Sequence, residues 1–168
     1  MDNTQIAELK ENSLALAEEI VKILDANKAG QIKLLRVNDQ TVMTDYFVIC
    51  TGNSNTHIRS LAGEVEFKLG EVGISHTGMD GYDSGMWIVM DYTTVMVHVF
   101  NREQRDFFKL EKLWADAEDI SIDNLASGSV SEMLMVASPV ASSYFTNALV
   151  FSLMLSSAIA PFSNHSRG

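Results

Sequence analysis

Two stretches of the chain carry apolar residues at helical spacing. The first extends from about Leu9 to Leu24, with acidic residues between the apolar positions. The second begins at Ile58 and ends at Gly70 and Gly73. A repeat of about 3.6 residues places such side chains on one face of a helix, and glycine commonly follows the last turn. We therefore expect two amphipathic helices in the first half of the chain.

Short runs of β-branched and aromatic residues alternate with these helices. The run at residues 46–50 is apolar throughout, as in a central strand that is buried on both faces. Two later runs flank Asp91-Tyr92-Thr93-Thr94, which predicts a β-hairpin. Strands are expected at residues 32–37, 46–50, 75–79, 87–90 and 95–100.

A third helix is predicted from about Glu103 to Ala117, since Asn101 is suited to cap it. The resulting order, α-β-β-α-β-β-β-α, predicts a single α/β domain with a mixed sheet of about five strands flanked by helices. The side chains of the third helix that we expect to face inward are Phe107, Leu110, Leu113, Trp114 and Ala117.

Charge divides the chain into two parts. Residues 1–123 carry the whole net charge of −10, because Glu132 and Arg167, the only charged residues from position 124 onward, cancel. We expect one domain over residues 1–123 and a low-charge extension over residues 124–168, to which we assign no role. Its apolar stretch at residues 144–162 fits an extra helix, a weak membrane anchor or a poorly structured segment. We favour an atypical extension with a helical stretch within residues 146–160, and membrane association is not expected.

The acidic composition excludes one class of partner and favours another. Phosphate binding needs clustered Lys and Arg, so we expect no sequence-specific nucleic acid binding, whereas a pI near 4.7 suits a basic protein partner.

Cys50 is the single cysteine of the chain, which excludes an intramolecular disulfide. Because its neighbours are apolar, a buried reduced thiol is predicted. The N-terminal residues do not resemble a signal peptide, and a cytoplasmic location is expected.

Neither the loop after the buried strand nor the histidines indicate a phosphate-binding, metal-binding or catalytic site. Thr51-Gly52-Asn53-Ser54 lies where phosphate loops occur, but it matches neither GxGxxG nor GxxxxGK[ST], so a turn and a helix cap explain it. The four histidines, at positions 57, 76, 98 and 165, show no metal-ligand spacing with Cys50. A structural role is favoured over proton transfer for His57 and His98.

Asp80, Asp83 and Asp91 are the remaining candidates for a metal-dependent site. Nucleotidyltransferases bridge two metal ions with carboxylates placed closely along one strand. Asp80 and Asp83 lie instead in a glycine-bearing loop, and Asp91 stands alone at a strand end, so turn chemistry accounts for them. We expect no enzyme, no cofactor and no metal site.

Aromatic residues concentrate between Trp87 and Trp114. Phe107 and Phe108 are adjacent on one predicted helix and cannot both face inward. Trp87 opens a strand beside a glycine-bearing loop and is expected to be half exposed. Either these rings pack in the core, or they form a protein-binding patch. The basic residues beside them are Arg102, Arg105, Lys109 and Lys112.

Four segments, in this order, resemble the ribosomal silencing factor family, also called the iojap-related proteins. They are TDYFVICTGNSNTHIRSLAGEV (residues 44–65), WIVMDY (87–92), VMVHVF (95–100) and REQRDFFKLEKLWADA (102–117). Together with the N-terminal helix, the resemblance covers roughly residues 5–120. This chain differs from the family pattern at Thr93-Thr94, where members usually have a glycine followed often by an acidic residue. The tail from Asn124 has no counterpart in the pattern.

The resemblance implies a small domain of nucleotidyltransferase-like topology without the catalytic carboxylates. Members dock on the large ribosomal subunit through ribosomal protein L fourteen and obstruct joining of the small subunit. They thereby repress translation, chiefly in nutrient limitation, and often form homodimers. The alternatives are a nucleotidyltransferase-like enzyme, or a large-subunit assembly factor like the organelle members.

The resemblance also implies a partner-binding face formed by the hairpin and the helix after it. On this face Trp87 and Tyr92 are expected to act as anchors, while Asp91 and Glu111 pair with basic groups of the partner. The full set of expected partner-binding residues is Trp87, Asp91, Tyr92, His98, Arg105, Leu110 and Glu111.

Overall fold

The computed structural model describes residues 1–123 and residue 125. Its helices are α1 (Asn3–Glu11), α2 (Ser13–Ala26), α3 (Asn55–Glu71), α4 (Arg102–Phe108) and α5 (Leu110–Leu113). Its strands are β1 (Gly30–Arg36), β2 (Tyr46–Thr51), β3 (Gly78–Asp80), β4 (Trp87–Asp91), β5 (Val95–Phe100) and β6 (Glu118–Ile120). The expected helical stretch within residues 146–160 lies outside the described residues. Within them, no helix is long and apolar enough to cross a membrane.

The strands form one mixed sheet in the order β3-β4-β5-β2-β1-β6. β2 and β5 are parallel, and all other neighbours are antiparallel. The predicted α/β architecture with a mixed sheet flanked by helices is confirmed, as is the hairpin between β4 and β5. β6 adds a sixth strand to the expected five. It pairs with Leu34–Arg36 of β1, and three residues are too few to show an alternating pattern in the sequence.

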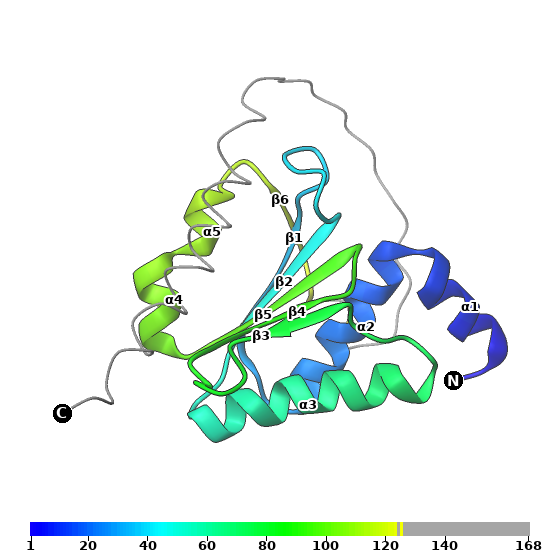
Figure 1. Cartoon of the computed structure of the whole chain (residues 1–168). Helices are drawn as coiled ribbons and strands as arrows, with labels where there is room; N and C mark the ends of the chain where they lie inside the picture. The colour runs from blue at the N-terminus through cyan, green and yellow to red at the C-terminus, as the bar shows by residue number, and fades with distance from the viewer. Residues whose placement is uncertain (124, 126–168) are drawn as a thin grey trace. The chain divides into compact units, whose positions relative to one another are not determined.

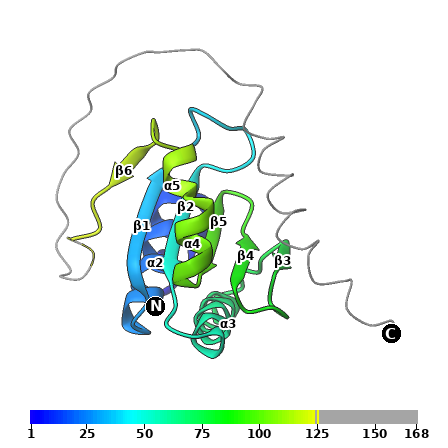
Figure 2. The same cartoon turned by 90° about the vertical axis from the view of Figure 1, so that its left-hand side faces the viewer.

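Helices cover both faces of the sheet (Figures 1 and 2). α2 and α3 pack on one face, where their apolar sides meet alternate residues of the central strands, such as Val48 of β2 and Val97 of β5. α4 and α5 lie on the other face. There the rings of Trp114 and Phe47 of β2 pack nearly perpendicular to each other, at 5.0 Å between centroids. The domain therefore has two apolar layers, one on each side of the sheet.

The first predicted helix is in fact two helices. Asn12 leaves the helical conformation (φ −117°, ψ 107°), and its side chain accepts hydrogen bonds from the backbone N–H groups of Leu14 (3.0 Å) and Ala15 (3.2 Å). Asparagine is among the best residues for capping a helix N-terminus. The chain therefore ends α1 at Glu11 and starts α2 one residue after the break.

The predicted third helix is also interrupted, at Lys109, whose φ of 48° and ψ of 50° are left-handed. The expectation that Phe107 and Leu113 face inward is wrong, because their exposed fractions are 76% and 42%. Phe108 makes the inward contact from α4, and residues adjacent on a helix point about 100° apart. Leu110 and Trp114 are buried as predicted.

Three local predictions are confirmed. Ser54 caps α3 by accepting a hydrogen bond from the backbone N–H of His57 (3.1 Å), and Asn101 caps α4 through the N–H of Gln104 (2.7 Å). Cys50 is fully buried, and burial raises the pKa of its thiol to about 12. The thiol is therefore protonated at neutral pH.

Candidate partner-binding site

Trp87 and Tyr92 point to opposite faces of the sheet. Successive side chains of a strand alternate between its two faces. Ile88, Met90 and Tyr92 belong to the core beneath α2 and α3, whereas the Trp87 ring lies 4.8 Å from that of Phe108 on α4. The expectation that the hairpin presents both rings on one docking face is therefore wrong.

Trp87 belongs to an aromatic layer between the sheet and α4. Its ring stacks on Phe100 of β5 at a centroid distance of 4.7 Å and an interplanar angle of 22°. Its indole Nε1 donates a hydrogen bond to Nδ1 of His98 at 3.3 Å. The side chain is buried, so the expectation that Trp87 is half exposed is wrong. The neighbouring strand and α4 together cover the ring.

His98 lies in the same layer on β5 and has no exposed surface. Its ring packs nearly perpendicular to that of Phe47, at 5.1 Å between centroids. Burial lowers the pKa of His98 to about 3, since an apolar layer disfavours the charged ring. His98 is therefore neutral at physiological pH and is a structural residue, as the sequence predicted.

Tyr92 is buried on the other face, and its ring meets that of His76 edge-on at 6.0 Å. Burial, assisted by the negative charge of Glu66, raises the pKa of the Tyr92 hydroxyl. Within the described part of the chain this hydroxyl has no hydrogen-bond partner. Tyr92 is thus a core side chain at the end of β4.

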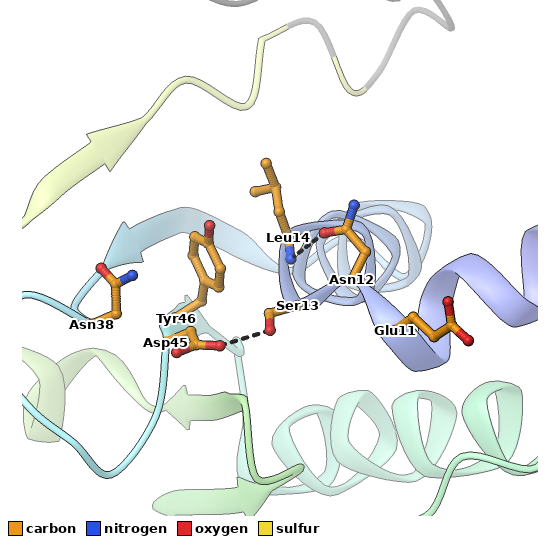
Figure 3. Close-up of a pocket in the computed structure, with 7 residues that line it drawn as sticks. All are labelled: Glu11, Asn12, Ser13, Leu14, Asn38, Asp45 and Tyr46. Carbon is orange, nitrogen blue, oxygen red and sulfur yellow. Dashed lines mark hydrogen bonds between the residues drawn. The ribbon is translucent and has the colours of Figure 1, made fainter. Parts of the chain in front are cut away.

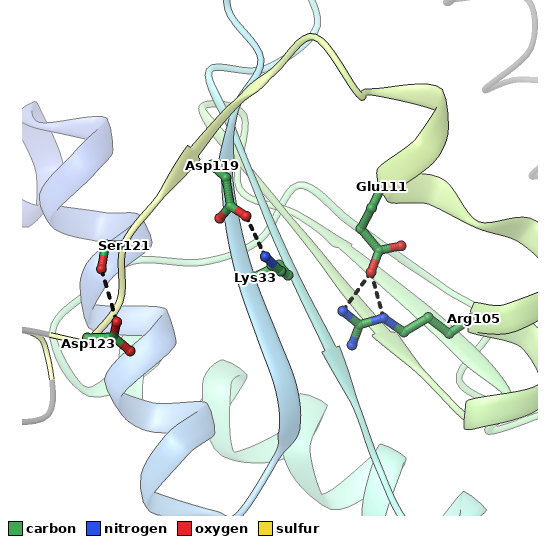
Figure 4. A network of polar contacts seen from close by, with 6 residues as sticks. All are labelled: Lys33, Arg105, Glu111, Asp119, Ser121 and Asp123. Carbon is green, nitrogen blue, oxygen red and sulfur yellow. Dashed lines mark hydrogen bonds and ion pairs between the residues drawn. The ribbon is translucent and has the colours of Figure 1, made fainter.

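Arg105 and Glu111 pair with each other (Figure 4). Two nitrogens of the Arg105 guanidinium, Nε and Nη2, donate to Oε1 of Glu111 at 2.7 and 2.6 Å, and the third, Nη1, donates to the hydroxyl of Thr51 at 2.8 Å. Arg105 is buried, whereas the side chain of Glu111 is 30% exposed. These bonds join α4, α5 and β2 across the break at Lys109. The sequence marked Thr51 only as part of a turn and gave no sign of this contact.

Asp91, predicted to pair with basic groups of a partner, is used in the hairpin turn. Its carboxylate accepts a hydrogen bond from the backbone N–H of Thr93 at 2.7 Å, which confirms turn chemistry at this position. Thr93 has a positive φ of 71°. The hairpin thus tolerates threonine where the family resemblance suggests glycine.

The seven predicted partner-binding residues are brought together only in part. Five of them are buried, and the other two are partly exposed but bonded within the chain. Whether they govern partner binding stays a prediction. The buried set is Trp87, Tyr92, His98, Arg105 and Leu110, and the partly exposed pair is Asp91 and Glu111.

The loop after β2 is a turn and a cap, as predicted. His57 accepts a hydrogen bond from the N–H of Asn53 at Nδ1 (3.1 Å), and its Nε2 donates to the carbonyl of Asn27 (3.0 Å). The ring therefore ties the start of α3 to the end of α2. Both ring nitrogens are engaged in the fold.

Groups that bind metals in other proteins are dispersed here. Among the described residues, no three His, Cys, Asp or Glu side chains gather as a metal site would require.

A hollow of about 390 Å³ lies where α1 meets α2, next to the loop between β1 and β2 (Figure 3). Ser13 donates to the Asp45 carboxylate there at 2.7 Å, while Asn12 caps α2. These polar groups hold the fold at that point.

The chain matches known proteins over most of its length. The family model described as "Ribosomal silencing factor during starvation" matches residues 10–140. The ribosomal silencing factor RsfS of Halalkalibacterium halodurans is 33% identical over 112 residues, which cover 67% of this chain and 96% of that protein. RsfS of Bacillus subtilis is 36% identical over 99 residues, covering 59% and 84%.

A solved structure is similar to this chain in both fold and sequence. The crystal structure of a protein from Chromobacterium violaceum superposes with a TM-score of 0.56 at 30% identity, over 68% of this chain and 88% of that one. The chain belongs to the ribosomal silencing factor family.

Proposed function

We propose that this chain is a cytoplasmic repressor of translation that binds the large ribosomal subunit and obstructs its joining with the small subunit. The observation that carries the proposal is the family match over residues 10–140. The matched bacterial relatives are named ribosomal silencing factors. The family resemblance adds ribosomal protein L fourteen as the docking partner and nutrient limitation as the condition.

Charge and architecture support this proposal. A net charge of −10 favours encounter with a basic ribosomal protein and raises the association rate at low salt. Obstruction by bulk requires no catalysis, only a firm footing at the interface between the subunits. A sheet covered by helices on both faces supplies a rigid body for that purpose.

The seven residues predicted from the family pattern enter the proposal in a changed role. Since five of them are buried, their substitution is expected to act by displacing α4, α5 or the hairpin. Loss of a direct contact is the expected effect only for the partly exposed Asp91 and Glu111.

Co-sedimentation of the full chain with isolated large ribosomal subunits, followed by a subunit-joining assay, tests the proposal. We expect the chain to sediment with large subunits and to lower the fraction of joined ribosomes in proportion to its occupancy. Sedimentation without an effect on joining would leave binding but overturn repression by obstruction. No sedimentation at moderate salt would overturn the proposal as a whole.

A further inference from the structure

A groove of about 460 Å³ lies between α1 and α2. Its volume is in the range of sites that take a small ligand or the side chains of a peptide. The residues of α2 that line it recur at helical spacing, so they form one face of that helix. The groove is lined by Glu8 and Leu9 of α1 and by Ala15, Glu18, Glu19 and Lys22 of α2, among others.

The fold uses little of the surface of α1. A helix of nine residues is marginal in water without packing, yet Leu9 is the one residue that α1 buries. Figure 1 shows α1 on the side of α2 that faces away from the sheet. Met1, just before α1, also lines the groove and is 61% exposed. The helix is therefore open to a partner along most of its length, including the side that lines the groove.

Caps at the start of both helices set the shape of the groove. At α1, the Asp2 carboxylate accepts a hydrogen bond from the N–H of Gln5 (2.8 Å), and the side-chain carbonyl of Gln5 accepts one from the N–H of Asp2 (3.0 Å). At α2, the break and cap at Asn12 fix the turn between the two helices. A surface that is held in one conformation loses little entropy on binding, so these contacts favour the groove as a docking site.

Negative charge dominates the groove. Its lining side chains include three glutamates and one lysine, a net charge of −2, and the amino group of Met1 offsets at most one of these charges. Lys22 pairs with Glu19 at 3.6 Å. Neither Glu8 nor Glu18 forms a hydrogen bond or an ion pair with another described residue. Glu18 is half-buried, and a carboxylate in such a position is stabilised by an incoming cation that donates hydrogen bonds to it.

The two helices extend this negative field beyond the groove. Residues 2–26 contain six acidic and two basic side chains, which gives a net charge of −4. Such a field attracts a positively charged partner over long range. The charge of the groove and that of its surroundings therefore both select a basic occupant.

The arrangement of the carboxylates identifies the kind of cation. In the described part of the chain, no three His, Cys, Asp or Glu side chains converge as metal ligands do, so Glu8, Glu18 and Glu19 are too dispersed to hold one metal ion together. Dispersed carboxylates match several cations spaced along a polypeptide, such as lysine and arginine side chains. Leu9 and Ala15 add apolar surface to the groove, which suits an apolar side chain of the same segment.

We propose that the groove between α1 and α2 binds a basic segment of a second protein. Lysine or arginine side chains of that segment pair with Glu8, Glu18 and Glu19, and an apolar side chain packs against Leu9 and Ala15. Because α2 covers the face of the sheet opposite α4 and α5, a partner in this groove leaves those two helices free. It is therefore additional to the partner that the proposed function requires.

Binding of a labelled peptide to the full chain, measured by fluorescence anisotropy, tests the inference. The probe is a peptide of about three helical turns that carries lysine and leucine on opposite faces. One reference peptide has glutamate in place of every lysine, and a second has serine in place of every leucine. We expect the lysine–leucine peptide to bind at least about tenfold more tightly than either reference, and its binding to weaken as salt is added.

Neutral variants test the role of charge. Glu8→Gln combined with Glu18→Gln and Glu19→Gln should bind the lysine–leucine peptide at least about tenfold more weakly than wild type. The matched control also removes three carboxylates, all exposed and on or beside α4 and α5, and should stay within about twofold of wild type. The control changes are Glu103→Gln, Asp106→Asn and Asp116→Asn.

A lysine introduced into the groove tests its position. Ala15→Lys places a cation beside the three glutamates, where it competes with the peptide, so we expect binding to weaken at least about tenfold. Ala7→Lys makes the same change of charge at an exposed position of α1 that does not line the groove, and should bind within about twofold of wild type. Should the triple glutamine variant melt earlier than its control, this pair of lysine variants decides.

Three results would overturn the inference. The first is that wild type does not bind the lysine–leucine peptide. The second is that the peptide with serine in place of leucine binds equally well, because charge alone would then account for the attraction. The third is an equal loss of binding in the groove variants and their controls, which would assign the attraction to the net charge of the whole chain.

Discussion

The indole Nε1 of Trp87 donates a hydrogen bond to Nδ1 of His98 across neighbouring strands, at 3.3 Å. This bond requires that Nδ1 carry no proton, because a protonated ring nitrogen cannot accept. Both side chains are buried in the layer beneath α4. The position of the Trp87 ring is therefore tied to the protonation state of His98.

We expect the free energy of unfolding to fall as the pH is lowered, because His98 is protonated less readily in the folded state than in the unfolded state. Its pKa is lowered from 6.5 to about 3 in the folded chain, so between those values the unfolded state binds the proton and the folded state does not. This contribution is fully present above pH 6.5 and is lost as the pH falls toward 3, with a slope of up to about 1.4 kcal/mol per pH unit. Urea unfolding at several pH values measures it. The difference in free energy of unfolding between wild type and His98→Gln should shrink over this window, and a constant difference would contradict the assignment.

Substitution of Trp87 should affect stability before it affects binding. Trp87→Ala removes the stacking on Phe100 and the bond to His98, and truncation of a buried tryptophan costs about 3–5 kcal/mol. Denaturant unfolding measures this loss. Phe67→Ala, at an exposed site, should change stability by less than about 0.5 kcal/mol. Equal, small effects of the two variants would show that Trp87 is not a core residue.

The Arg105–Glu111 pair should stabilise the attachment of α5. Glu111→Ala leaves a buried guanidinium without its carboxylate partner, and loss of hydrogen bonds to a charged group costs about 2 kcal/mol. Asp106→Ala, which removes an exposed carboxylate from α4, serves as the control, with an expected change below about 0.5 kcal/mol. The free energy of unfolding of the two variants gives the comparison. Similar losses in the two variants would mean that removal of a negative charge from these helices, and not the loss of this pair, lowers the stability.

The sequence predicted the positions of the strands better than the direction of their side chains. Residues 46–50 are apolar without exception, so burial of β2 followed directly from composition. In β4, however, residues 87–90 are apolar and buried on both faces, and the one polar residue, Asp91, comes only at the end of the strand. The opposite orientations of Trp87 and Tyr92 become visible only once α3 and α4 are placed on their separate faces.

The burial of Arg105 could not be predicted from the sequence either. Arg105 lies among basic residues on a predicted surface helix, where a solvated side chain is the usual outcome. Its burial depends on Thr51, which is 54 positions away in the chain, and on the break at Lys109 that brings Glu111 back toward it. Long-range pairing of this kind leaves no periodic pattern.

Gly52 should be intolerant of a side chain, whereas Gly63 should accept one. A Cβ at Gly52 would lie 2.6 Å from Cγ1 of Ile58, a side chain fixed in the core, while one at Gly63 meets nothing within 4 Å. We expect Gly52→Ala to destabilise by about 1–3 kcal/mol through overpacking. Gly63→Ala, in the middle of α3, should stabilise by up to about 1 kcal/mol. In thermal melting, Gly52→Ala should have a lower melting temperature than wild type and Gly63→Ala a higher one. The reverse order would refute the packing argument.

Thr93 is the position at which this hairpin should be improved by substitution. Its φ of 71° places a β-branched residue in the left-handed region, which costs about 1–2 kcal/mol for residues other than glycine. The side chain is exposed, and the bond to Asp91 uses only the backbone N–H. Thr93→Gly should therefore stabilise the chain by about 0.5–1 kcal/mol, part of the relief being offset by the flexibility of glycine when unfolded.

Thr94→Gly is the matched control for that substitution, because Thr94 is adjacent but does not have a positive φ. Its carbonyl also accepts the N–H groups of Asp45 and Tyr46, so added flexibility loosens the junction between the hairpin and β2. We expect Thr94→Gly to destabilise by about 0.5–1 kcal/mol, measured beside Thr93→Gly by urea unfolding. If both glycine variants destabilise equally, Thr93 is not strained, and the threonine pair is as well suited to this turn as glycine.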